Sequence, residues 1–283
     1  MRAKRRATHK GLPGMLLHTR YVGMRSKPLE LTVTPRWAMN YAAAVNDPNP
    51  RYFNDEAPEQ FVAPPMLATA LTWQIAGQFD AFWDTTDFPS EVMQRQVHFS
   101  EVLRWHKPMR PGTTLTITGE VAAILPHRAG THFIVRFDAH DPTGERVFHE
   151  YIGGLLRDVS CEGERQGGET IPEPKRFPEP ARPEWEEIIP ISKLAAHQYD
   201  GGADIHFPIH TSRAFAHGVG LPDIIYHGTA TLAQALREIV DREADGDPTA
   251  LLEVRCMFTD TVALGSNVAL RVWACNESDE GTE

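Results

Sequence analysis

The chain has 283 residues, of which 41% are hydrophobic and 23% are charged, and its formal net charge is −10. This length allows two domains of ordinary size or one large one, and the composition is typical of a globular protein. Because the net charge is negative and the Lys and Arg residues are scattered after the start of the chain, the sequence argues against a nucleic-acid partner.

Three features bear on the compartment. No apolar run approaches the roughly 20 residues that span a bilayer. The basic opening "MRAKRRATHK" is followed by an apolar stretch too short and broken for a signal peptide. Cys161, Cys256 and Cys275 are widely spaced and form no CxxC pair, which argues against a disulfide framework and a thiolate zinc site. We therefore expect a cytoplasmic protein with no membrane partner.

The first part of the chain predicts a short extension and then a helix followed by strands. Residues 1–29 are expected to form the extension and residues 30–157 the first unit. An apolar helix pattern covers residues 66–76 in this unit. Alternating apolar and polar residues, typical of strands, then cover residues 95–124, 131–141 and 146–157.

The second part repeats this order after a linker. Residues 158–184 are rich in Pro, Glu and Gly and are expected to be extended. Residues 185–283 form the second unit, in which a histidine-containing loop precedes a helix pattern at 228–240 and strand patterns at 250–274.

Matching positions indicate that the two units arose by duplication. Pro50 corresponds to Pro208 and Gly112 to Gly265, with sequence offsets that agree to within a few residues. A helix that is apolar on nearly all sides must be enclosed to remove its surface from water. The sequence therefore predicts an α+β protein in which each unit is a buried helix wrapped by an antiparallel sheet.

The helix-then-sheet order, the duplication and the D-x-N-P-like loop before the helix resemble the MaoC-like, or R-specific enoyl-CoA hydratase 2, family of double-hotdog proteins. "FPIHTSRAFA" with "IIYHGTATLA" is the most specific part of a resemblance that covers about residues 30–157 and 185–275. It implies a double hotdog that hydrates trans-2-enoyl-CoA to (R)-3-hydroxyacyl-CoA, or catalyses the reverse dehydration, in fatty-acid, steroid or related acyl-CoA metabolism. The acyl-CoA would be the substrate, with no metal or redox cofactor.

The loop at residues 201–212 admits a metal site or an acid–base site. His206 and His210 have helical i, i+4 spacing, which would place both imidazoles on one face. Pro208 lies between them and two glycines precede them, so a helix is not expected there and neither is a metal site.

The acid–base interpretation depends on one residue of register. The family pattern G-D-x-N-P-x-H places its catalytic histidine at His210. Its catalytic Asp falls on Ile205 without a gap, and on Asp204 if the loop contains a one-residue bulge. We expect Asp204 and His210 to act as the catalytic pair, with His206 in a supporting role; an Asx turn is the structural alternative for Asp204.

The start of the second helix predicts a site for the thioester oxygen. The first amide N–H groups of a helix have no intrahelical partner and carry the positive end of its dipole. The family resemblance gives Gly228 the backbone N–H that stabilises the enolate, with His227 beside it. Gly228 could instead serve helix–sheet packing, and Thr229 could cap the helix or contact substrate.

The first unit looks like a catalytically silent copy. Asp47, Asn49 and Pro50 match D-x-N-P, but Tyr52 stands where the histidine should be. The resemblance implies that such a half makes room for the acyl chain, which Met66 and Leu67 are candidates to contact; core packing is the alternative for both. For the coenzyme A phosphates the candidates are Arg213, Arg104, Lys107 and Arg110; a solvated surface position is the alternative for each.

The second unit shows no counterpart of the last two strand patterns of the first. We therefore expect its sheet to lack those strands. Either the chain is a truncated copy, or another chain completes the sheet in a homodimer or a hetero-oligomer with another hotdog chain. The alternative functions are an acyl-CoA thioesterase and a non-catalytic acyl-CoA-binding subunit of a hydratase complex.

Overall fold

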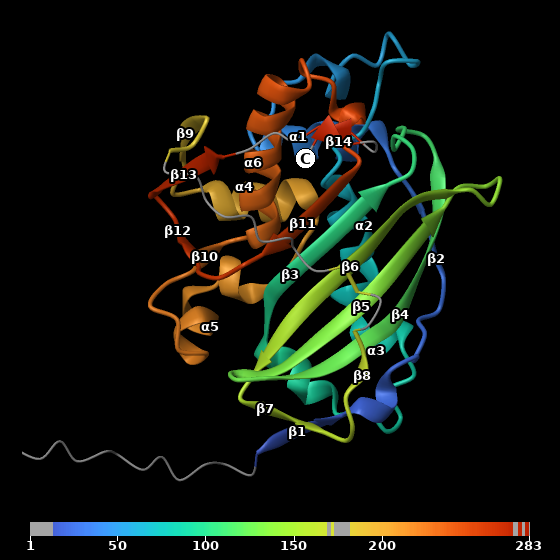
Figure 1. The fold of residues 1–283 in the computed structure, drawn as a ribbon, viewed down its shortest axis with the longest axis vertical. Coiled ribbons are helices and arrows are strands. Elements are labelled where there is room, and N and C mark those ends of the chain that lie inside the picture. Colours follow the sequence, from blue (N-terminus) through green and yellow to red (C-terminus); the bar gives the residue numbers. More distant parts are fainter. Residues whose placement is uncertain (1–13, 169–170, 173–181, 274–276, 279–280, 283) are drawn as a thin grey trace, which may run out of the picture.

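The computed structural model describes residues 14–168, 171–172, 182–273, 277–278 and 281–282 (Figure 1). The basic start, residues 169–170 and 173–181 of the predicted linker, and Cys275 lie outside the described residues. Cys161 and Cys256 are free thiols. No helix among the described residues is long and apolar enough to cross a membrane.

The α-helices are α1 (Pro35–Ala44), α2 (Leu67–Ala76), α3 (Phe79–Phe82), α4 (Ala195–Ala203), α5 (Arg213–Gly218) and α6 (Gly228–Glu243). The 3-10 turns are η1 (Thr19–Tyr21), η2 (Pro50–Tyr52), η3 (Ser90–Arg95), η4 (Pro208–His210) and η5 (Pro248–Ala250). The strands are β1 (Met15–His18), β2 (Leu29–Thr32), β3 (Gln96–Trp105), β4 (Thr114–His127), β5 (Gly130–His140), β6 (Arg146–Arg157), β7 (Val159–Glu162), β8 (Gln166–Gly167), β9 (Trp185–Pro190), β10 (Ile225–Tyr226), β11 (Glu253–Met257), β12 (Val262–Ala263), β13 (Asn267–Val272), β14 (Glu277–Ser278) and β15 (Gly281–Thr282).

The first unit is a long helix enclosed by a curved antiparallel sheet. Helix α2 confirms the predicted apolar helix, and its residues from Leu67 to Thr72 are all buried. The sheet has the strand order β11-β3-β6-β5-β4-β2, with β8 also paired to β4, and α2 lies behind it in the view of Figure 1. Such a helix has no polar face to offer to water, so the sheet must cover it.

The second unit has a long helix with much shorter strand pairs. Helix α6 confirms the predicted helix and buries one face, which includes Ala230, Ala233 and Leu236. Strand β9 pairs with β13 and β10 pairs with β12. Strand β11, which follows α6, instead pairs with β3 of the first unit. One sheet therefore joins the two units.

The structure repeats itself across the two units in detail. Pro50 and Pro208 each begin a 3-10 turn. Gly112 and Gly265 each adopt positive φ, of 93° and 77°, a conformation that glycine enters without a steric cost. The helices before the two loops, α1 and α4, pack against each other, so the loops leave the same junction in opposite units.

Candidate functional site

A cavity of about 1220 Å³ opens between the two units. The second unit contributes η4, β10, the amino end of α6 and the residues after β11. The first unit contributes the carboxyl half of α2 and the ends of β3 and β6. Neither unit alone would form this cavity.

The loop before η4 contains no inserted residue. Asp204 adopts the left-handed conformation at φ 58°, as Asn46 does at φ 55° in the first unit. Both lie four positions before the proline that begins the 3-10 turn. The bulge that would move Asp204 into the place of the family's Asp is therefore not found, and Ile205 occupies the position of Asp47.

Asp204 and His206 do not line the cavity, whereas Ile205 does. The Asp204 carboxylate accepts from His206 Nε2 at 2.8 Å, and its side chain is 54% exposed. The other ring nitrogen of His206 lies 2.9 Å from Asp200 Oδ2. The hydrogen bond to Asp200, followed by the weaker effect of Asp204, raises the pKa of His206. These three side chains form an ion-pair cluster on the surface rather than the expected pair with His210.

His210 lines the cavity in a form suited to accept a proton. Its Nδ1 lies 2.8 Å from the carbonyl oxygen of Ile225. A carbonyl only accepts, so Nδ1 carries the hydrogen and Nε2 is the nitrogen left for a ligand. Burial lowers the pKa of His210 to about 4, so its imidazole is neutral at pH 7.

His227 supports His210 by stacking. The two rings have centroids 3.7 Å apart and an interplanar angle of 22°. The His227 side chain is buried, and neither ring nitrogen has an aligned hydrogen-bond partner among the described residues. Burial, followed by repulsion from His210, lowers the pKa of His227 far below its usual range. A neutral ring in this place fixes the orientation of His210.

The amino end of α6 opens into the same cavity. Gly228 is its first residue and lines the cavity with Thr229 and Thr231. The His227 side chain does not cap the helix. A Cβ on Gly228 would lie 3.1 Å from Phe258, so a side chain there would crowd the ring. The Thr229 hydroxyl accepts a hydrogen bond from Tyr199 at 3.0 Å, and its place in the cavity wall leaves it able to contact a ligand.

The remaining predicted contacts lie elsewhere. Met66 and Leu67 are buried in the core and do not line the cavity, because they precede the part of α2 that faces it. Trp73 and Phe79 line the cavity instead. Arg213 is an exposed side chain 3.1 Å from Asp223 and lies outside the cavity lining.

The corresponding loop of the first unit is engaged in structural contacts. The Asn49 amide donates to the carbonyl of Gly246 at 2.8 Å, beyond the carboxyl end of α6. Burial raises the pKa of Asp47 to about 6, and Asp47 accepts from the backbone N–H of Asn49. Tyr52 is buried beside Val62. These side chains hold the first loop against the second unit.

Sequence reasoning missed the residues that the first unit gives to the site. His98 of β3 lines the cavity, and its ring lies 4.5 Å from that of Phe258. Nothing in the strand pattern around His98 distinguishes it from an ordinary sheet residue, because the pairing that brings it to α6 is long-range. Among the described residues no group of three or more His, Cys, Asp and Glu is placed to hold a metal ion.

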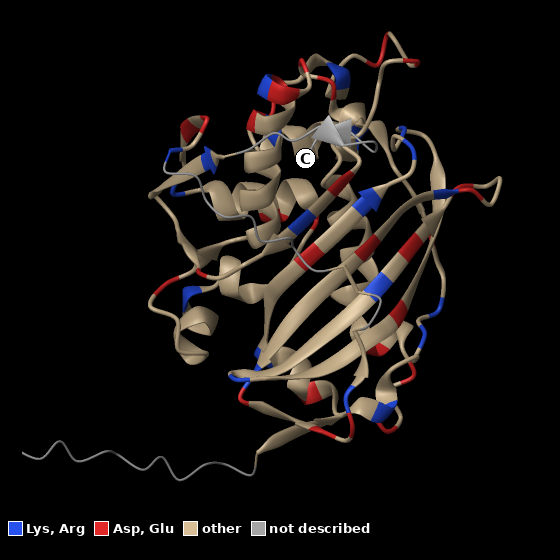
Figure 2. Cartoon of the chain, viewed as in Figure 1, with Lys and Arg blue, Asp and Glu red and all other residues tan. Residues whose placement is uncertain are grey.

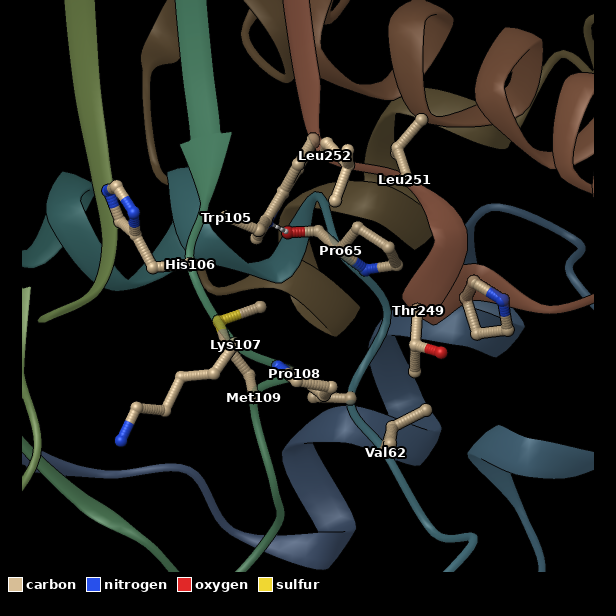
Figure 3. A pocket seen from close by; sticks show the side chains of 12 residues that line it. Val62, Pro65, Trp105, His106, Lys107, Pro108, Met109, Thr249, Leu251 and Leu252 are labelled. Carbon is tan, nitrogen blue, oxygen red and sulfur yellow. Dashed lines mark hydrogen bonds between the residues drawn. The ribbon is translucent and has the colours of Figure 1, made fainter. Parts of the chain in front are cut away.

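A second, smaller cavity of about 100 Å³ lies at the far end of β3 (Figure 3). Its walls include Pro65, Trp105 and Leu251, and Trp105 Nε1 donates to the Pro65 carbonyl at 3.1 Å. This space is too small for an acyl chain. Acidic and basic positions are interspersed over the face of the molecule in Figure 2, so this view shows no basic face for the coenzyme A phosphates.

Comparisons with known proteins agree with this architecture. Residues 20–150 match the family model described as the FAS1-like dehydratase domain region, and residues 179–283 match that of the MaoC-like domain. A UPF0336 protein of Streptomyces avermitilis is 30% identical over 141 residues, which are 47% of this chain and 90% of that protein. The enoyl-CoA hydratase ChsH3 of Mycobacterium tuberculosis is 24% identical over 262 residues, which are 89% of this chain and 87% of that protein.

Among solved structures, a MaoC-like dehydratase of Phytophthora capsici superposes with a TM-score of 0.76 at 20% identity, over 89% of this chain and 86% of that one. At this identity the likeness concerns the fold. The expected α+β double hotdog is thereby confirmed. The two matched domains, the relatives and the shared fold lead to one conclusion: the chain belongs to the MaoC-like family of double-hotdog proteins.

Proposed function

We propose that this protein hydrates trans-2-enoyl-CoA thioesters to (R)-3-hydroxyacyl-CoA and catalyses the reverse dehydration. The support is a cavity that joins a neutral imidazole to the amino end of a long helix, together with a relative named as an enoyl-CoA hydratase. Coenzyme A enters as part of the substrate, and the proposed reaction needs no metal or redox cofactor.

The observation that carries the proposal is the state of His210. Because Nδ1–H donates to the Ile225 carbonyl, the Nε2 lone pair is available to take a proton from water. The low pKa keeps this nitrogen unprotonated at neutral pH. A base is required at the β-carbon, where the water oxygen forms its new bond.

The amino end of α6 would stabilise the enolate that forms during this step. As water adds to the β-carbon, the electron pair of the double bond moves onto the thioester oxygen. The free N–H groups at a helix start, Gly228 first, favour negative charge at that point. The missing side chain at Gly228 lets the oxygen approach the backbone. The α-carbon then gains a proton and the thioester is restored.

The wall formed by the first unit favours a long or bulky acyl group. Trp73, Phe79 and Ile152 supply apolar surface away from His210. Burial of such a chain stabilises the bound complex by roughly 25 cal/mol per Å² of apolar surface removed from water.

The test is a panel of trans-2-enoyl-CoA substrates with short, long and ring-bearing acyl groups, incubated with the purified chain. Loss of the enoyl absorbance with an intact thioester supports the proposal. Release of free thiol would replace it with a thioesterase. Substrate unchanged throughout the panel would overturn the catalytic proposal.

One observation favours the second candidate, a non-catalytic acyl-CoA-binding subunit. Ile205 and Phe207 line the cavity at the positions where the family pattern has its Asp and Asn. Under that alternative, acyl-CoA binds with measurable heat in calorimetry while the substrate panel stays unchanged.

A further inference from the structure

The loop before η4 leaves the proposed site one proton-transferring group short. Hydration needs a base for the water and an acid for the α-carbon. His210 can serve one of these roles, and Ile205 stands where the family pattern provides a carboxylate. A second group must therefore come from another wall of the cavity.

The opposite wall contains such a group, formed by a buried histidine and glutamate. His98 Nε2 lies 3.1 Å from Glu101 Oε2 and 3.2 Å from the carbonyl oxygen of Ser100. The Glu101 side chain is fully buried, and its carboxyl oxygens have no aligned hydrogen-bond partner among the described residues. His98 itself lines the cavity.

A β-bulge creates this pairing. In a regular strand, residues three apart point to opposite faces. The register between β3 and β6 shifts between His98 and Ser100, which brings the His98 ring onto the face of Glu101. Gly153, opposite Ser100, has no space for a side chain, since a Cβ there would lie 2.0 Å from Ser100 Oγ.

Phe258 places His98 beside the amino end of α6. Its ring centroid lies 4.5 Å from that of His98. The same ring lies 3.1 Å from the position that a Cβ on Gly228 would take. Phe258 follows β11, and its backbone N–H donates to the Phe99 carbonyl at 2.9 Å. The shared sheet thus sets His98 near the oxygen site, with the Phe258 ring in contact with both.

A second buried carboxyl group keeps Glu101 protonated at neutral pH. Glu150 of β6 is fully buried next to Glu101 and in reach of Thr72. Burial raises the pKa of Glu101 to about 8. Burial, followed by repulsion from Glu101, raises the pKa of Glu150 well above its usual range. Two carboxylates cannot both ionise in so apolar a place, so a proton is held there at pH 7.

We propose that His98, supplied by Glu101, is the second catalytic residue and delivers the proton to the α-carbon. This inference rests on the proposed hydratase function. His210 Nε2 takes a proton from water as the oxygen bonds to the β-carbon. In the reacting state the proton of Glu101 resides on His98, so Nε2–H donates to the Ser100 carbonyl beside the Glu101 carboxylate while Nδ1–H transfers its proton to the α-carbon of the enolate. His98 is then neutral with its hydrogen on Nε2, and the proton on His210 returns to His98 Nδ1 through water in the cavity before the next turnover.

The first test separates the two carbons of the reaction. A saturated acyl-CoA cannot be hydrated, but a base at its α-carbon exchanges the α-hydrogens for deuterium in D₂O, which mass spectrometry counts. His98→Gln should abolish this exchange, while His210→Gln should leave it within about 3-fold of the parent chain, because no water is activated. Exchange that persists in His98→Gln would overturn the assignment.

The second test follows hydration itself. His98→Gln and Glu101→Gln should each lower kcat on the order of 100-fold with a smaller change in KM. The matched control is His149→Gln, which changes the same residue type in the same sheet. His149 is paired to Arg104 and lies on the other face of the sheet, so this variant should retain parental turnover. Thermal unfolding of each variant shows whether it is folded. Folded variants with parental kcat would overturn the inference and leave the hydratase proposal standing.

The pH dependence of hydration distinguishes a role of Glu101 in proton transfer from a purely structural role, which would not change the pH profile. The groups that face Glu101 and His98 are Glu150 of β6, Tyr199 of α4, Cys256 of β11 and His210 of η4. Hydration by the parent chain should fall as pH rises through about 8, where Glu101 loses its proton. Glu101→Gln should remove this fall. If the parent chain hydrates no enoyl-CoA yet exchanges α-hydrogens through His98, the hydratase proposal fails and the assignment of His98 stands.

Discussion

The hydroxyl groups of Tyr41 and Tyr199 lie 3.1 Å apart at the contact between α1 and α4. Both side chains are fully buried, and the two residues are corresponding positions of the duplicated units. Tyr199 also donates to Thr229 in the wall of the cavity. A polar chain therefore runs from the centre of the duplication to the start of α6.

Removal of one hydroxyl from this chain should destabilise the whole molecule. Tyr199→Phe leaves the buried Thr229 and Tyr41 hydroxyls short of a partner, which costs about 1–3 kcal/mol of unfolding free energy. Urea unfolding measures the difference. The Tyr41→Phe, Tyr199→Phe double variant should lose less than the sum of the two single variants, because both singles break the same bond. Additive losses would show that the two hydroxyls do not interact.

The two candidates for proton transfer from the histidine loop should behave very differently. His210→Ala should reduce turnover by a factor on the order of 100 or more if His210 is the general base. Asp204→Asn should change turnover less than about 3-fold, because the side chain lies outside the cavity. Asn also tolerates the left-handed backbone at this position, so it should fold. Steady-state kinetics on the preferred enoyl-CoA decides the matter, and a large loss in Asp204→Asn would restore that residue to the mechanism.

A methyl group at the helix start should separate activity from stability. Gly228→Ala places a Cβ 3.1 Å from Phe258, at the proposed oxygen site, and should lower kcat about 10-fold or more. The unfolding free energy should change by less than about 1 kcal/mol, since alanine suits a helix. Gly201→Ala in α4 is the control, because a Cβ there meets no atom within 4 Å. Equal activity in the two variants would argue against the oxygen site.

Buried histidines should make the fold sensitive to mild acid. Burial lowers the pKa of both His98 and His210 to about 4 in the folded chain, against about 6.5 in an unfolded one. Between these values the unfolded chain binds more protons, so the unfolding free energy falls as pH drops from 6.5 toward 4. Each group contributes up to about 1.4 kcal/mol per pH unit. Denaturation at pH 7.5, 6 and 5 should show this fall, with a shallower slope in His210→Gln; equal slopes in the two proteins would contradict the assignment.

Glu101 should act in the opposite direction. Its pKa of about 8 in the folded chain lies above the usual value, so the folded state binds more protons between about pH 4.5 and 8. Its contribution is present at low pH and is lost as pH rises through this window. Glu101→Gln should therefore unfold at a higher temperature than the parent chain at pH 8 and above, even though it is expected to hydrate poorly. A lower melting temperature there would contradict the buried, protonated state.

The sequence predicted what local patterns encode. Helix α2 follows from a largely apolar segment, and Pro208 explains why no α-helix joins His206 to His210. The register of Asp204 did not follow, because a bulge and a regular loop differ by one residue, and only the backbone conformation of Asp204 distinguishes them. The position of His98 in the cavity could not be predicted from the sequence either, because it depends on β3 pairing with a strand about 150 residues later in the chain.

That pairing has a consequence for folding. Strand β11 matches Glu253 with Arg104 and Met257 with Ser100, so its backbone hydrogen bonds are completed by the first unit rather than by its own. If the second unit melted alone, an edge of the first sheet would lose its partner. The two halves are therefore expected to unfold together, in a single cooperative transition with equal calorimetric and van't Hoff enthalpies. Two halves that repeat one another in local structure are in this way joined into one thermodynamic unit.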